Sequence, residues 1–390
     1  MPTTATGTES VATETRGAAM EISVSKADLL KELTATQGVV ERKTTIPILS
    51  NFLFEAAGDK LTITATDLDL SLRTSCPAKT KKEGSCTIPA RKLYDYVKLL
   101  GEGEISIKLL ENHWVQIRSG RSNTKMVGMA RANFPALPLF PQGTAYKLPA
   151  KVISTLIGKT VFAISNEESR YTLNGALMVL KPESMTMVAT DGHRLAHIEN
   201  TTARFAGLSG ELKILVPKKA LLEIHSLIGQ ADVESIEFAK DESTLFFKVG
   251  DRLLTSRQLT GQFPNYEAVL PKDNNKAIVV GCDEISAAIQ RVAQFADERS
   301  GAIRLRVEKN ELKVSATSTE TGESEDSLET TYAGEPMTIG FNSQYLLDFM
   351  KSAGTPEIRF EFKDPQSAGQ LRPEGDSDYK YRYIVMPMRI

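Results

Sequence analysis

KLTITATDLDL, residues 60–70, alternates apolar and polar side chains and runs into Ala65-Thr66-Asp67. This alternation predicts a half-buried β-strand that ends in a turn. The pattern returns in SMTMVATDGHRL, residues 184–195, and more weakly in ELKVSATSTE, residues 311–320. The repeated alanine stands at positions 65, 189 and 316, which are 124 and 127 residues apart. Repeats of this length predict three tandem copies of a whole domain, because solenoid and propeller units have about 20–50 residues.

Each copy also contains two amphipathic helical segments. The first segment lies at residues 25–40, 149–164 and 283–296, and the second at 87–101, 215–229 and 338–354. Pro89 and Pro217 fit a first helical turn, whereas Gly101, Gly229 and Gly354 fit C-caps. The fold class is therefore α+β, with two helices packed on antiparallel sheets in each copy. Turn-rich junctions place the domains at residues 20–145, 146–272 and 273–390.

Composition excludes several classes of protein. The chain has 390 residues, of which 41% are hydrophobic and 25% charged, and its formal net charge is −2. These values are typical of a globular protein and exclude a disordered, collagenous or histone-like chain. The three cysteines are too few and too scattered to form a disulfide framework or a cysteine-based zinc site. We therefore expect a reducing cytoplasm as the location.

The N-terminal segment and the hydropathy argue against targeting to a membrane. No run approaches the roughly 18 apolar residues of a membrane-spanning helix. Residues 1–19 are rich in Thr, Ala and Gly and have no apolar core, so a signal peptide is not expected. We predict a disordered tail over residues 1–19, with Met20 as a candidate for the natural start.

Catalytic and metal-binding motifs are scarce. The sequence has no P-loop, G-x-G-x-x-G, G-x-S-x-G or H-E-x-x-H. His193 and His197 lie four residues apart on a predicted strand, hence about 13 Å apart, too far to bind one metal ion. Asp67 and Asp69 are predicted to share a strand face, where a solvated edge is the commoner explanation. The acidic run Glu320–Glu329 is predicted to be a solvated loop. We expect no cofactor and no catalytic residue.

The C-terminus carries the remaining signal. Ile384-Val385-Met386-Pro387-Met388 is apolar almost to the chain end, whereas free termini are normally polar and frayed. A last β-strand explains the residues up to Val385. The methionines that follow suit a binding surface, because Met adapts to varied partners.

These segments together resemble the bacterial beta sliding clamps, the processivity subunits of replicative DNA polymerases. The matching pieces include TIPILSNFLFEA, ATDLDLSL, IPARKLYDYVKLL, YTLNGALMVL, VATDGHRLA, QFPNYEAVLPK, IGFNSQYLLD and the terminal YIVMPMRI. They cover residues 20–390, and only the 19-residue tail departs. The resemblance implies a head-to-tail homodimeric ring whose helices line a central pore.

Simple geometry supports a ring of two chains. Twelve helices side by side at a spacing of ~9 Å enclose a hole about 24 Å wide, enough for duplex DNA. Six helices would leave only about 7 Å. A near-neutral chain also suits a sliding protein, because strong phosphate binding would hold it in place.

The resemblance also implies a hydrophobic pocket for short extended peptides of the polymerase, the clamp loader and repair proteins. Its lining residues would be Leu173, Thr190, Gly192, His193, Arg194, Leu195, Pro264, Val269, Ile384, Val385, Met386, Pro387 and Met388, with Asn342 and Tyr345 at the rim. Some members of the family carry a basic residue where this chain has Ala268, which removes one polar contact with the peptide.

Two further surfaces follow from the resemblance. DNA contacts are implied for Lys43, Arg170 and Tyr171. The dimer interface would join the edge strand around Thr124 and Met126 to the helix around Gln294 and Phe295.

The leading hypothesis is a non-enzymatic DNA-binding clamp that acts in DNA replication by tethering the polymerase to its template. Two alternatives remain open. One is a monomeric three-domain scaffold that binds peptides and never encircles DNA. The other is a metal-dependent hydrolase that would use Asp67, Asp69 and His193.

Overall fold

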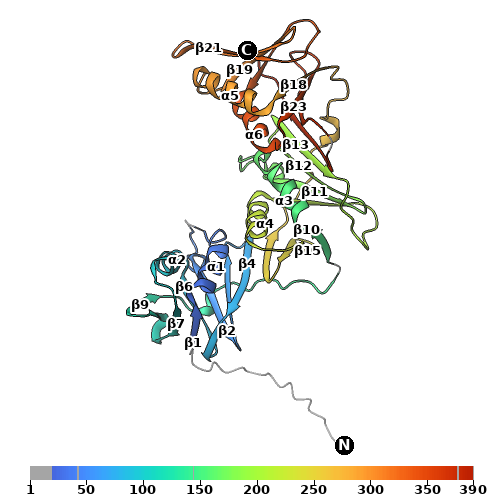
Figure 1. Ribbon diagram of the computed structural model, residues 1–390. Coiled ribbons are helices and arrows are strands. Elements are labelled where there is room, and N and C mark those ends of the chain that lie inside the picture. The colour runs from blue at the N-terminus through green and yellow to red at the C-terminus, as the bar shows by residue number, and fades with distance from the viewer. Residues whose placement is uncertain (1–19, 42–43, 144, 376, 390) are drawn as a thin grey trace, which may run out of the picture. The chain divides into compact units, whose positions relative to one another are not determined.

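The computed structural model describes residues 20–41, 44–143, 145–375 and 377–389. The tail predicted for residues 1–19 lies outside the described residues. The chain forms two compact units (Figure 1). The first unit runs to Pro138 and includes Asp251–Leu253, and the second contains Leu139–Gly250 and the chain from Leu254 onward.

The first unit contains the first copy of the repeat. One antiparallel sheet has the order β5 (Lys79–Lys82), β1 (Glu21–Ser25), β7 (Glu104–Leu109), β8 (Trp114–Ser119) and β9 (Ser122–Val127). A second group of strands has the order β4 (Leu70–Pro77), β3 (Lys60–Thr66), β2 (Asn51–Ala57) and β6 (Gly84–Pro89). The helices α1 (Lys26–Thr36) and α2 (Ala90–Leu99) pack against each other.

The second unit is organised by one antiparallel sheet of eight strands. Its order is β14 (Leu212–Pro217), β11 (Gly175–Lys181), β12 (Ser184–Thr190), β13 (Arg194–Asn200), β25 (Tyr379–Val385), β24 (Gly369–Pro373), β23 (Glu357–Phe362) and β18 (Lys276–Gly281). In its middle, β13 of the second copy pairs with β25 of the third, from Arg194 opposite Val385 to Asn200 opposite Tyr379. The last strand of the chain therefore joins two copies into one sheet.

Shorter strands and two helix pairs complete the second unit. A ribbon is formed by β10 (Tyr146–Pro149), β15 (Ser235–Lys240) and β16 (Thr244–Val249). The next strand in the chain, β17 (Arg252–Arg257), belongs to this unit from Leu254 onward. A four-stranded sheet has the order β21 (Gly322–Glu329), β20 (Glu311–Ser318), β19 (Ala302–Glu308) and β22 (Met337–Asn342). The pairs are α3 (Ala150–Gly158) with α4 (Lys218–Gln230) and α5 (Cys282–Val292) with α6 (Ser343–Ala353).

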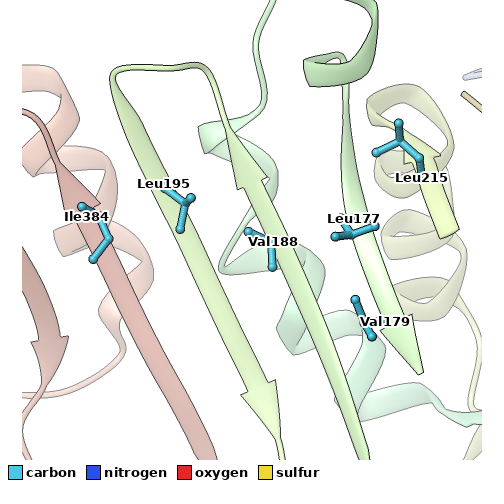
Figure 2. Packing of buried hydrophobic residues seen from close by; sticks show 6 residues of the cluster. All are labelled: Leu177, Val179, Val188, Leu195, Leu215 and Ile384. Atoms are coloured by element: carbon cyan, nitrogen blue, oxygen red, sulfur yellow. The ribbon is translucent and has the colours of Figure 1, made fainter. Parts of the chain in front are cut away.

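Both faces of the eight-stranded sheet are covered around β11 and β12, whose side chains are almost all buried. The helices α3 and α4 contact one face. On the other face a row of side chains crosses five neighbouring strands (Figure 2), namely Leu215, Leu177, Val179, Val188, Leu195 and Ile384. Leu259, Phe263, Tyr266 and Leu270 pack on this row. We call the segment that carries them, residues 258–270, the strap.

The helix ends differ in detail from the prediction. Gly354 is the C-cap of α6 with φ +67°, the left-handed conformation that glycine adopts without strain. The prediction of C-caps at Gly101 and Gly229 was wrong. The C-cap of α2 is Leu100, and α4 continues through Gly229 to Gln230. Pro89 and Pro217 occupy the N-cap, one position earlier than expected.

Candidate functional site

The Thr190–Arg194 turn between β12 and β13 is held by its own side chains. The carboxylate Oδ1 of Asp191 accepts hydrogen bonds from the backbone N–H groups of His193 and Arg194, at 3.0 and 3.1 Å. Thr190 Oγ1 accepts from the Gly192 N–H at 3.1 Å and donates to the Arg194 carbonyl at 2.6 Å. Gly192 has φ +91°, and a Cβ there would lie 2.8 Å from Arg170 Nη1. Glycine adopts this conformation without strain, and any larger side chain would have to displace the Arg170 guanidinium.

The first copy builds the same turn. Asp67 Oδ1 accepts from the N–H groups of Asp69 and Leu70, and Thr66 Oγ1 donates to the Leu70 carbonyl. Leu68 stands where the second copy has glycine and has φ +84°. The expectation that Asp67 and Asp69 share a strand face was wrong, since both lie in the turn after β3. The Asp67 carboxylate has a structural role, because it satisfies backbone donors.

Arg194 ties this turn to the third copy. Its Nε donates to Asp191 Oδ2 at 3.0 Å, its Nη1 donates to Asp348 Oδ2 on α6 at 2.6 Å, and its Nη2 donates to the Phe162 carbonyl at 2.7 Å. The side chains of Arg194 and Asp348 are only 10% and 19% exposed. A guanidinium held by charged partners from both copies fixes the two against each other.

Aromatic rings enclose the same guanidinium. Its Cζ lies 4.4 Å from the Tyr345 ring centroid and 5.5 Å from that of Phe162. The His193 ring stacks on the Tyr345 ring, with their centroids 6.5 Å apart. Burial disfavours the charged form, but Tyr383 and the two carboxylates outweigh it and hold the pKa of Arg194 above its ordinary value. The cation therefore persists in the partly buried site.

The C-terminal segment lies against the Thr190–Arg194 turn and forms a second wall of the site. Ile384 and Val385 are fully buried in β25. Beyond the strand, the Met386 N–H donates to the His193 carbonyl at 2.9 Å, and the Met388 N–H donates to the Gly340 carbonyl at 2.8 Å. The terminus is therefore docked by main-chain bonds to two different segments. Met386 nevertheless remains 43% exposed.

An apolar cavity of about 130 Å³ lies between the Thr190–Arg194 turn, the strap and the C-terminal segment. It is lined by Leu173, Thr190, Gly192, His193, Arg194, Leu195, Pro264, Tyr266, Val269, Ile384 and Met386. A cavity of this size accepts an apolar side chain rather than a whole cofactor, since complete ligand pockets measure about 300–1,000 Å³. We call it the peptide pocket.

Ten predicted pocket residues line this cavity, and the other five are placed differently. Tyr345 does not line the cavity, but its ring stacks on His193, which does. Asn342 caps α6, because its Oδ1 accepts from the N–H groups of Gln344 and Tyr345. Val385 is buried in β25, whereas Pro387 and Met388 border a neighbouring cavity of about 470 Å³.

Tyr266 was not predicted as a lining residue, although it lies in the FP-x-Y segment of the strap. Its ring centroid lies 5.6 Å from that of His197. Burial, with the positive charge of Arg382, lowers the pKa of His197 to about 4, so the imidazole is neutral at pH 7. The neutral His197 ring packs against Tyr266 and so supports the strap.

The residues expected to contact DNA divide into three cases. Arg170 pairs with Glu167 at 2.7 Å, and its Nη1 donates to the Asp191 carbonyl at 2.9 Å, which places it against the pocket turn. Tyr171 is 73% exposed at the start of a short 3-10 helix, Tyr171–Leu173. Lys43 lies outside the described residues.

β9 is the last strand of its sheet within the described residues. At the end of the β8–β9 ladder, the Gly128 N–H donates to the His113 carbonyl. Bonded and non-bonded pairs alternate in an antiparallel ladder. The N–H groups of Asn123, Lys125 and Val127 therefore point away from β8. The predicted interface residues Thr124 and Met126 are half-buried on this strand.

β21 is a second open edge among the described strands. The Thr330 N–H donates to the Asn310 carbonyl, so the same alternation points the N–H groups of Glu323, Glu325 and Glu329 away from β20. The prediction of a solvated loop over Glu320–Glu329 was wrong, because its alternate residues Ser324, Asp326 and Leu328 are half-buried against the sheet. Two more predicted interface residues, Gln294 and Phe295, lie on the 3-10 turn Ala293–Phe295, which contacts β21.

In the described part of the chain, no three His, Cys, Asp or Glu side chains are arranged to hold a metal ion. Over the same residues, no helix is long and apolar enough to cross a membrane.

Substituting Asp348→Ala is expected to lower the free energy of unfolding of the second unit by about 1–3 kcal/mol, because the partly buried Arg194 loses a charged hydrogen-bond partner. Denaturant unfolding followed by circular dichroism measures the change. Lys351→Ala, an exposed position on the same helix, is the control. Equal stability of the two variants would show that the Arg194–Asp348 pair contributes nothing.

Comparison with known proteins identifies relatives along the whole chain. Three family models match in tandem: the N-terminal, central and C-terminal domains of the DNA polymerase III beta subunit, at residues 20–138, 147–265 and 267–389. The beta sliding clamp of Caulobacter vibrioides is 35% identical over 378 residues, which cover 95% of this chain and 100% of the relative. That of Escherichia coli K12 is 33% identical over 373 residues, with the same coverage.

Solved structures give the same result. A crystal structure of the Caulobacter crescentus beta sliding clamp superposes with a TM-score of 0.88 at 34% identity, covering 96% of this chain and 100% of the other. The sliding clamp of Bartonella birtlesii, solved with griselimycin bound, gives 0.89 at 32% identity, covering 95% and 100%.

Proposed function

The chain belongs to the DNA polymerase III beta subunit family, the beta sliding clamps, and from this premise we propose that two copies close into a ring around duplex DNA and hold the polymerase through the peptide pocket. It is a DNA sliding clamp, the non-catalytic processivity factor of the DNA polymerase III holoenzyme. Membership of this family supports the clamp over both the hydrolase and the monomeric scaffold. Its place of action would be the cytoplasm, with the replication machinery.

The observation that carries the proposal is the apolar cavity between β13, the strap and the docked C-terminus. Burial of an apolar anchor there contributes about 25 cal/mol per Å² removed from water. The exposed side chains of Val269 and Met386 are positioned to cover such an anchor. The pocket is therefore suited to a short extended peptide with apolar anchors, carried by the polymerase and equally by the clamp loader and repair proteins.

Dimerisation would occur through the two open edges, β9 and β21. Each carries backbone N–H groups that point outward, and unpaired edges tend to pair with another strand. The charges are complementary: Arg118, Arg121 and Lys125 are exposed on or beside β9, whereas Glu323, Glu325 and Glu329 are exposed along β21. The basic β9 edge and the acidic β21 edge therefore attract each other, whereas two β9 edges or two β21 edges repel. Thr124, Met126, Gln294 and Phe295 would pack alongside.

Retention on DNA would depend on closure of the ring rather than on tight phosphate binding. The net charge of −2 fits weak contacts, for which Lys43, Arg170 and Tyr171 are candidates. Of these, Tyr171 is the most exposed in the described part, and its ring is suited to brief contacts with DNA. Arg170 is already engaged with the pocket turn, so we expect its contribution to DNA contact to be small.

The test is retention on circular and linear DNA. Clamp loaded by its clamp loader onto a nicked plasmid is expected to stay bound through gel filtration in about 0.5 M salt, which suppresses phosphate contacts. Cutting the same plasmid once should release it within minutes. Equal release from both forms of the plasmid would contradict encirclement.

A further inference from the structure

We propose that the peptide pocket continues beneath the strap into a second cavity, which binds the residues of the partner peptide that flank its apolar anchors. The inference rests on the proposed function of the pocket. The second cavity has a volume of about 430 Å³, within the range of about 300–1,000 Å³ typical of ligand sites. We call it the strap cavity.

The two cavities share a wall. Pro264 and Tyr266 line both the peptide pocket and the strap cavity. These residues are two positions apart, so even a fully extended chain places them no more than about 7 Å from each other. A peptide that leaves the peptide pocket past Pro264 therefore reaches the strap cavity within a few residues.

The floor of the strap cavity is the sheet itself. Leu177 of β11 and Leu215 of β14 lie on the face drawn in Figure 2, and Leu259 and Phe263 of the strap pack against them. The rim is polar, with Lys213, Gln262 and Glu267. Lys213 is already paired with Glu211 at 3.1 Å, so the rim offers no free cation for an acidic residue, and Glu267 disfavours one. An uncharged segment with small apolar or amide side chains fits this lining.

One buried polar atom indicates which kind of hydrogen bond a bound peptide would make in the strap cavity. Gln258 lines this cavity, and its side-chain oxygen Oε1 is buried and has no hydrogen-bond partner within the described chain, so a small rotation of the amide would present the oxygen to the cavity. Buried acceptors are nearly always satisfied, so an unpaired one calls for an explanation. A backbone or amide N–H of an entering peptide would supply the missing donor. An extended peptide offers such donors at every second residue along each edge.

The experiment compares two fluorescein-labelled peptides from the catalytic subunit of DNA polymerase III. The short one is the minimal segment that binds the clamp, and the long one adds four native residues at each end. We expect the long peptide to bind about tenfold more tightly, the effect of one or two added hydrogen bonds with some apolar burial. Fluorescence anisotropy measures both dissociation constants.

Two strap variants test the site. Gln262→Trp places a bulky indole at the exposed rim, where it obstructs the strap cavity, and should make the two peptides bind equally, while the short peptide keeps its affinity. Thr260→Trp is the matched control, because Thr260 is exposed on the same strap and does not line the cavity. It should preserve the tenfold difference. Gln258→Leu, which removes the acceptor, should reduce that difference several-fold.

The outcomes separate this inference from the proposed function. Equal binding of both peptides to the unmodified protein, or a tenfold difference that survives Gln262→Trp, would overturn the strap cavity and leave the peptide pocket intact. Failure of every polymerase segment to bind the unmodified protein would overturn both.

Discussion

Deletion of Met386–Ile390 is expected to abolish stimulation of the polymerase while leaving the dimer and the fold intact. β25 ends at Val385, so the eight-stranded sheet keeps all its strands. The deletion removes the Met386 wall of the peptide pocket and its main-chain bond to the His193 carbonyl. Loss of about 1.5–3 kcal/mol of apolar burial against Met386 weakens binding of the peptide about 10- to 150-fold.

Primer extension on a single-stranded circle, with the polymerase limiting, measures the effect. Deletion of Arg389–Ile390 alone is the matched control, since it spares both Met386 and the bond from Met388 to Gly340. Mass photometry and circular dichroism check the dimer and the fold of each truncated protein. Full stimulation by the longer deletion would show that the polymerase binds elsewhere.

The repeated fold could be predicted because its signal is local. The threonine and aspartate of the turn after β3 and after β12 bond to backbone groups within four residues, so their spacing in the sequence is their spacing in space. Alternation along β3 and β12 and the helical periodicity of α2 and α4 are equally local. Three copies of such a unit define the fold class without any knowledge of how the copies meet.

The interior of the site depends on contacts that no local pattern encodes. Arg194 and Asp348 are 154 positions apart, and the strap meets β11 and β14 only after the chain has folded. Tyr266 and Asp348 were therefore missed. The pocket residues were found through family resemblance and not through periodicity. What the residues alone indicated was that an apolar C-terminus needs a partner surface.

The acidic run Glu320–Glu329 shows why composition can mislead. Its charged residues indicated a solvated loop, yet every second position faces the sheet, and the carboxylates lie along an open edge. Arg291 of α5 pairs with Asp326 across this surface at 2.5 Å. Charge on an edge strand prevents promiscuous pairing while permitting an oppositely charged partner. Most of the run is therefore an edge strand with exposed carboxylates, and not a loop.

Lys125→Pro is expected to convert the dimer into monomers. Proline removes one backbone N–H, and at position 125 that group points away from β8, so the β8–β9 ladder loses none of its own bonds. The substitution also removes a positive charge from the edge that would face Glu323, Glu325 and Glu329. Both effects act on pairing with a second chain, and one chain contributes two such junctions to the ring.

Mass photometry at sub-micromolar concentration distinguishes a species of about twice 42.8 kDa from the single chain. Lys125→Thr is the matched control, because it removes the charge and keeps the N–H donor. Threonine also has a high strand propensity. If the edge pairs through its main chain, the proline variant is monomeric and the threonine variant remains largely dimeric but more sensitive to salt. If both variants dissociate equally, the charge closes the ring and the main chain does not. If both remain dimeric, β9 is not the interface, and the ring would have to close through another surface.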